Sequence, residues 1–230
     1  MSLRRLFVVA SIAVMAAPLV RSAFAADNLQ STLQRLDQAA ARFQKTSTDF
    51  KFVTEQTDPV PDTDTMEGRA YYERTGKDFQ MAAHIETDNG RKAPKVYSFS
   101  KGQFKLYEPG VHQITVFTRA SKFADYIMLG FGASGRQLED KWDIKDLGPE
   151  TIDGVQTEKL ELVAKDPTVK KNLPKVTIWM DLDRAVSLKQ IFDEGQGQSR
   201  TCTYKNLRTN QPLPPGVFDI NDSQAQTVVR

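Results

Sequence analysis

The chain has 230 residues, with 31 Lys and Arg against 29 Asp and Glu, and a single cysteine. This length suits one domain with a substantial core, and one cysteine excludes an intramolecular disulfide. A charge so near zero removes the main electrostatic argument for nucleic-acid binding, so no nucleic-acid partner is expected.

The N-terminus has the pattern of an export signal. Arg4 and Arg5 precede an apolar stretch that ends at Val20, and small residues surround Ala25. A membrane anchor is the alternative, but the apolar stretch is short and interrupted. We therefore predict a signal peptide over 1–25 and one mature domain over 26–230 in an exported compartment. Cleavage would lower the basic count from 31 to 28, which leaves a net charge of about −1.

The first mature segment predicts an amphipathic helix. Asn28 can cap it, and its apolar residues recur at spacings of four and three. Such a helix must lie on a sheet, either as simple core packing or as the lining of a ligand cavity. The apolar stripe consists of Leu29, Leu33, Leu36, Ala40 and Phe43.

The stretch from Met66 to Ile85 predicts an antiparallel hairpin. Apolar and polar residues alternate with a period of two, and a polar loop with Gly76 at its bend separates the two halves. One face is apolar. The other, which includes Tyr71 and His84, is expected to face water.

Short alternating segments with short turns fill most of the remaining chain, which is the pattern of a meander. A polar segment near Asp166 predicts about one helical turn. The chain is expected to be mainly β with α, with about eleven strands and two helices. Such a sheet should curl into a barrel, or into a half-barrel closed by helices, to hide its edges.

The second predicted helix runs from Ser121 to Leu129 and is followed by Gly130 and Gly132. Its apolar character indicates either a buried helix or a movable cover, since glycines at the ends of a loop permit hinge motion. The candidate cover residues are Ile127, Met128, Leu129 and Phe131.

No motif for reaction chemistry is present in the sequence. There is no nucleophile elbow, phosphate-binding loop or Gly-x-Gly-x-x-Gly motif, and His84 and His112 lie in different segments without a neighbouring cysteine. Cys202 alternates with polar residues in a predicted strand and is interpreted as a packed thiol. We therefore expect no enzyme activity, no cofactor and no metal.

The order of several segments resembles that of the LolA family, the periplasmic outer-membrane lipoprotein carriers. The resemblance covers most of the mature chain. It rests on the first helix, Asp49–Val53, Glu67–Arg74, Phe79, Trp142–Ile144, Ile152–Val155 with Lys159–Leu162, Val176–Asp181, and the Pro-rich end with Phe218.

The resemblance implies an unclosed antiparallel β-barrel whose helices cover an apolar cavity. It implies a monomeric carrier that takes lipoprotein acyl chains from an inner-membrane release complex to an outer-membrane receptor. Arg74 falls where the family often has an arginine that latches the lid, although Thr75 replaces the family's usual proline. The alternative is a lipid-binding sensor of envelope stress with the same fold, although such proteins usually carry an additional C-terminal domain.

Aromatic and Met-rich walls suit an acyl chain, because many adaptable apolar contacts can both hold and release it. Ordinary core packing is the alternative for each such residue taken singly. The candidate walls are Phe50, Phe52, Met66, Tyr72, Phe79, Met81, Phe99, Phe104, Leu106, Phe117 and Met180.

Overall fold

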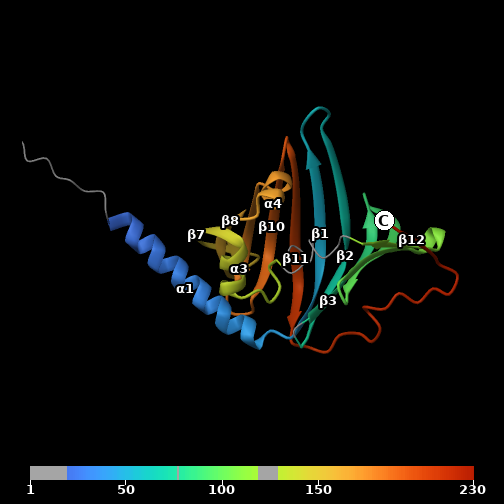
Figure 1. Ribbon diagram of the computed structural model, residues 1–230, viewed down its shortest axis with the longest axis horizontal. Coiled ribbons are helices and arrows are strands. Elements are labelled where there is room, and N and C mark those ends of the chain that lie inside the picture. Colours follow the sequence, from blue (N-terminus) through green and yellow to red (C-terminus); the bar gives the residue numbers. More distant parts are fainter. Residues whose placement is uncertain (1–19, 77, 119–128) are drawn as a thin grey trace, which may run out of the picture.

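A single curved sheet forms most of the molecule (Figure 1). The computed structural model describes residues 20–76, 78–118 and 129–230. Its 12-stranded sheet has the order β12-β6-β5-β4-β3-β2-β1-β11-β10-β9-β8-β7. The strands are β1 (Lys45–Gln56), β2 (Asp62–Thr75), β3 (Asp78–Asp88), β4 (Arg91–Ser100), β5 (Gln103–Glu108), β6 (Gln113–Phe117), β7 (Trp142–Ile152), β8 (Val155–Ala164), β9 (Lys175–Asp181), β10 (Val186–Gly195), β11 (Gln198–Thr209) and β12 (Gln226–Val229).

The sheet is an unclosed barrel, as the sequence predicted. In the spatial order given above, every pair of neighbouring strands from β6 across the sheet to β7 is antiparallel. The last pair differs, because β12 runs parallel to β6. The edges of the sheet are β7 and β12, which do not neighbour each other. The predicted hairpin is confirmed as β2 and β3, with Tyr72 opposite Met81 and Ala70 opposite Ala83.

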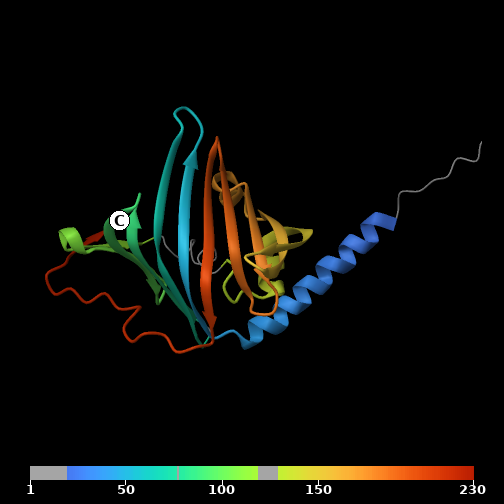
Figure 2. The ribbon, with the colours of Figure 1, turned by 180° about the vertical axis from the view of Figure 1, so that it is seen from behind.

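The C-terminal part of helix α1 (Val20–Arg42) packs on the β7–β10 half of the inner face, and its N-terminal part projects past that edge of the sheet (Figures 1 and 2). The helix begins before the predicted cleavage position. Leu33 and Leu36 of its apolar stripe are buried against β7–β10, so the predicted amphipathic stripe is confirmed. The predicted cap was wrong, because Asn28 lies inside the helix, where its side chain donates to Asp146. This first core cluster also contains Leu138, Trp142, Leu160, Leu162, Val176, Ile178 and Met180.

A second core cluster lies on the same face of the sheet, toward β1, β2, β3 and β11. Phe50 and Phe52 of β1 are only partly buried against it. The cluster consists of Phe43, Ala70, Tyr72, Met81, Phe131, Val186, Cys202 and Tyr204. The inner face is therefore divided into a half filled by α1 and a half that has less covering.

The C-terminal segment covers part of the outer face. The Val217 carbonyl is 2.8 Å from His84 Nε2, and Ser98 Oγ donates to the Phe218 carbonyl at 3.4 Å. Tyr71 is only 6% exposed. The expectation that Tyr71 and His84 face water was therefore wrong, because the segment after β11 lies over them before it forms β12.

The shorter helices differ in how well the sequence predicted them. Helix α4 (Pro167–Asn172) is the expected turn, capped by Asp166. Helix α3 (Gly135–Lys141) was not predicted, although Ser134 and Gln137 form a capping box at its start. A 3-10 turn, η1 (Pro109–Val111), connects β5 to β6. Most of the helix predicted from Ser121 lies outside the described residues. Among those residues, no helix combines the length and the apolar character needed to span a membrane.

Candidate ligand cavity

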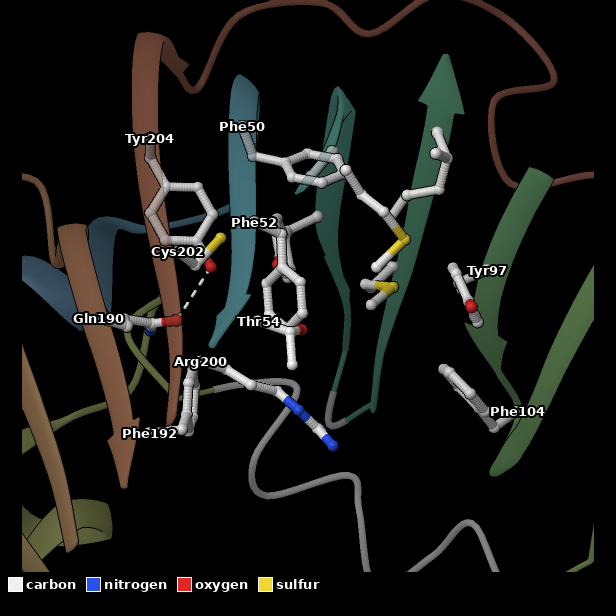
Figure 3. A pocket seen from close by; sticks show the side chains of 16 residues that line it. Phe50, Phe52, Thr54, Tyr97, Phe104, Gln190, Phe192, Arg200, Cys202 and Tyr204 are labelled. Carbon is white, nitrogen blue, oxygen red and sulfur yellow. Dashed lines mark hydrogen bonds between the residues drawn. The ribbon is translucent and has the colours of Figure 1, made fainter. Parts of the chain in front are cut away.

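A cavity of about 550 Å³ opens on the less covered half of the inner face (Figure 3). This volume lies within the range of about 300–1,000 Å³ that is typical of small-molecule sites. Most of its lining is aliphatic, aromatic or sulfur-containing. The lining residues are Phe50, Phe52, Thr54, Met66, Ala70, Tyr72, Met81, Ala83, Ile85, Tyr97, Phe104, Gln190, Phe192, Arg200, Cys202 and Tyr204.

The strand register explains why these residues share one face. Phe52 lies directly between Cys202 of β11 and Met66 of β2. Residues opposite each other in an antiparallel pair project from the same side of the sheet, and residues two apart in one strand do so as well. A period of two in each strand therefore assembles one continuous apolar wall.

Six of the eleven predicted wall residues line this cavity, namely Phe50, Phe52, Met66, Tyr72, Met81 and Phe104. The other five are absent from its lining. Phe79 and Phe99 stack on each other with ring centroids 4.9 Å apart, and Phe117 packs on Phe104 at 5.6 Å. Leu106 lies opposite Tyr97 in β4. Met180 is fully buried in the first core cluster, where α1 fills the space above it.

Several lining residues were not among the predicted walls. Tyr97 and Phe192 continue the apolar wall into β4 and β10. Gln190 and Arg200 are polar, so a search for apolar residues overlooks them. The signal that could have found them is their position in the alternation, since Gln190 precedes Phe192 by two residues and Arg200 precedes Cys202 by two.

Phe131 packs against Tyr72 and Tyr204, which line one end of the cavity, although it is not itself among the lining residues. Its ring stacks on Tyr72 with centroids 4.0 Å apart and meets Tyr204 edge-on at 4.9 Å. Only 1% of Phe131 is exposed. Leu129, another predicted cover residue, is buried in the first core cluster. The remaining two, Ile127 and Met128, lie outside the described residues.

Polar contacts fix the chain around Phe131 to β10. Gln190 Nε2 donates to the Leu129 carbonyl at 2.5 Å, and Gln190 Oε1 accepts from the Tyr204 hydroxyl at 2.9 Å. Gly130 has a φ of +86°, and a Cβ there would overlap the Gln190 amide. Glycine is therefore required at this position, both for its backbone conformation and for the close approach of the two segments.

Arg74 connects the Phe131 segment to the end of α1. Its Nη2 donates to the Gly132 carbonyl at 2.7 Å, and its Nη1 donates to the Ala40 carbonyl at 3.2 Å. The Arg74 backbone N–H also donates to the Gln44 carbonyl at 2.7 Å. One guanidinium thus bridges two segments that cover the inner face of the sheet.

Three buried groups in the cavity wall, Cys202, Tyr72 and Tyr204, are held in their neutral forms. Burial raises the pKa of the Cys202 thiol to about 12. Burial likewise raises the pKa of the Tyr72 and Tyr204 hydroxyls above their usual value. A thiol with so high a pKa is a poor nucleophile near neutral pH, which agrees with the interpretation of Cys202 as a packed thiol. Within the described part of the chain, no three His, Cys, Asp or Glu side chains are grouped so that they could hold a metal ion.

No protein-family model matches the sequence. No curated protein matches it either. Solved structures do resemble the chain. MucB is 15% identical, with a TM-score of 0.53 over 88% of this chain and 66% of that chain. An uncharacterized conserved protein from Thermus thermophilus is 10% identical, with a TM-score of 0.53 over 88% of this chain and 99% of that chain.

A putative outer membrane lipoprotein-sorting protein domain from Vibrio parahaemolyticus is also similar. It is 13% identical, with a TM-score of 0.44 over 84% of this chain and 97% of that chain. At these identities the comparisons establish the fold. The chain therefore shares the fold of MucB and of the Thermus thermophilus protein, and its sheet is the unclosed barrel that the sequence predicted.

Proposed function

We propose that the chain is a periplasmic carrier that encloses lipoprotein acyl chains and moves them from the inner to the outer membrane. The observation that carries this proposal is the apolar cavity of about 550 Å³ on the inner face of an unclosed barrel. On this proposal the carrier performs no covalent chemistry. It meets a release complex at one membrane and a receptor at the other.

Such a carrier must offset the free energy that it costs to expose an acyl chain to water. Exposing an acyl chain to water costs about 0.8 kcal/mol per methylene, so a chain of about sixteen carbons costs roughly 12 kcal/mol. Apolar walls offset this cost without directional bonds. The two methionines in the lining, Met66 and Met81, add adaptable contacts that suit a cargo that must also leave.

Phe131 and Arg74 serve as the cover and its latch on this proposal. Phe131 packs against Tyr72 and Tyr204 at one end of the cavity. Arg74 holds the carbonyl next to Phe131 while it also holds the end of α1. Breaking these two hydrogen bonds would remove one of the links that hold the Phe131 segment. The backbone hydrogen bonds of Gly130 and Gly132 to β10 and the preceding turn, and the bond from Gln190 to Leu129, would also have to open before the segment could leave the wall.

The test is whether the mature protein binds lipid through this wall. Native mass spectrometry of the purified protein should detect bound lipid or lipoprotein, and a fluorescent fatty-acid probe should bind after lipid is removed. Phe52→Glu should weaken probe binding at least tenfold, because it places a carboxylate in the apolar wall. Lys51→Glu is the matched control, since the exposed Lys51 side chain projects from the opposite face of the same strand. Equal probe binding by both variants, or no lipid binding at all, would contradict the proposal.

A second candidate function is a lipid-binding regulator of envelope-stress signalling. MucB favours it, because MucB has the same fold and has been solved in complex with MucA. The two functions differ in what depletion of the protein should do. Mislocalised lipoproteins would support the carrier, whereas altered stress signalling with correctly placed lipoproteins would support the regulator.

A further inference from the structure

One charged side chain interrupts the apolar lining of the cavity. Of the 16 described residues that line it, Arg200 alone carries a charge. It lies two residues before Cys202 on β11 and directly opposite Thr54 of β1 and Phe192 of β10. Its neighbours in the register thus belong to the wall, and its stem is part of the lining.

Arg200 marks the end of the cavity remote from Phe131. Figure 3 shows its side chain reaching across the cavity beside Thr54, while Tyr204 lies at the other end. The Arg200 side chain is 47% exposed, so water reaches the guanidinium. The cavity therefore has an aromatic end beside Phe131 and an end open to solvent, where Arg200 supplies the one charge of the described lining and is paired with Glu194.

The partner of Arg200 is itself a carboxylate. Arg200 Nη1 lies 3.1 Å from Glu194 Oε1, and both residues belong to the hairpin of β10 and β11. An ion pair this exposed contributes little to folding. An arginine fork can, however, hold a carboxylate or phosphate by two parallel hydrogen bonds. A ligand anion can take the place that Glu194 occupies.

We propose that Arg200 holds the anionic headgroup of a single-chain amphiphile, whose acyl chain runs along the wall toward Tyr72 and Tyr204. The headgroup is a carboxylate, as in a fatty acid, or a phosphate, as in a lysophospholipid. A cavity of about 550 Å³ suits one such ligand. This inference rests on the proposed acyl-binding function and adds the charge of the ligand and the residue that selects it.

The test compares ligands of equal chain length that differ in charge. The delipidated protein is titrated with palmitate and with hexadecanol, each displacing the fluorescent probe. The native protein should bind palmitate about tenfold more tightly or better, as expected for hydrogen bonds to a charged group. Lysophosphatidate is the third ligand. Tighter binding of palmitate would identify a carboxylate headgroup, and tighter binding of lysophosphatidate would identify a phosphate.

Three variants test whether Arg200 causes the preference for palmitate over hexadecanol. Arg200→Gln should bind hexadecanol normally and lose the preference for palmitate, whereas Arg200→Lys should keep only part of it, because the charge remains but the planar fork is lost. Arg69→Gln is the matched control: Arg69 also pairs with one carboxylate, Asp49, and is 52% exposed, but it lies outside the cavity lining. It should behave as the native protein.

Each outcome separates this inference from the proposed function. Equal binding of palmitate and hexadecanol by the native protein, or an unchanged preference in Arg200→Gln, would overturn the role of Arg200 and leave acyl binding intact. Failure of all three ligands to displace the probe from the cavity would overturn both.

Discussion

Arg74 is the residue whose hydrogen bonds have the clearest consequence for movement of the cover. Arg74→Met would remove donors to the Gly132 and Ala40 carbonyls while keeping an apolar stem of similar shape. Each hydrogen bond from a charged donor is worth about 1.5–3 kcal/mol, so we expect faster loss of a bound acyl probe, by about tenfold or more. Stopped-flow transfer of the probe to acceptor vesicles measures this rate.

Arg74→Lys and Arg69→Met are the controls for that measurement. A lysine presents one compact ammonium group and lacks the planar fork, so it should restore only part of the slow release. Arg69, also on β2, pairs with Asp49 of β1, so Arg69→Met should leave the release rate unchanged. Release that is equally slow in the native protein and in Arg74→Met would refute the latch.

Individual residues also show where the alternation of apolar residues fails to predict the cavity lining. The walls from β1, β2 and β3 could be predicted because large apolar residues recur at every second position, as Phe50 and Phe52 do. Met180 also alternates correctly, yet it is buried beneath α1 and does not reach the cavity. Alternation identifies the face of a strand, but it does not say which part of that face a helix will fill. Polar lining residues such as Arg200 give no apolar signal at all.

At the scale of elements, the strands were more predictable than the contacts of the C-terminal tail, the segment after β11. Hairpins are local, so a period of two and a turn glycine are enough to identify them. The pairing of β12 with β6 is parallel and joins residues more than a hundred positions apart. The four residues of β12, Gln226 to Val229, are all exposed and do not alternate between apolar and polar, so the period of two that marks a half-buried strand is missing from the sequence.

The tail is attached to the sheet through Asp222. Its Oδ2 lies 2.8 Å from His112 Nδ1 and accepts from the Tyr107 hydroxyl at 2.8 Å, just before β12 begins. Hydrogen bonds from His112, Tyr107 and the Gln224 backbone N–H lower the pKa of the Asp222 carboxyl below its usual value of 3.8. Because the folded-state pKa is lowered, this stabilisation is present above about pH 4 and is lost as the pH falls through the lowered pKa.

Asp222→Asn should therefore loosen β12 at neutral pH. The expected result is faster hydrogen exchange of the Gln226 amide, whose N–H donates to the His112 carbonyl at 2.8 Å. The difference from the native protein should shrink when both are compared below the lowered pKa, since the native carboxyl is then protonated. Asp219→Asn removes a carboxylate from the same tail and serves as the control. Identical exchange in Asp222→Asn and the native protein at pH 7 would refute the attachment.

At the scale of the whole molecule, ligand binding and folding stability should be linked. A ligand that binds only the folded state stabilises it by about 2.7 kcal/mol at a hundred times its Kd. For a domain of about 150–250 residues, 1 kcal/mol corresponds to a Tm change of about 2–4 °C, so saturating palmitate should raise Tm by about 5–10 °C. Differential scanning fluorimetry of the delipidated protein measures this shift.

Phe52→Glu provides the control for that shift. The variant should show a much smaller rise at the same palmitate concentration, because its cavity wall carries a charge. An equal rise in both proteins would mean that palmitate stabilises the fold from another site, and no rise in the native protein would contradict binding in the cavity.

The division of the inner face separates the packed core from the hollow. Helix α1 packs its leucines into the first core cluster, and the hollow lies beside that cluster rather than within it. If the chain binds acyl chains as proposed, release of the ligand should therefore empty the hollow and leave the packing beneath α1 unchanged.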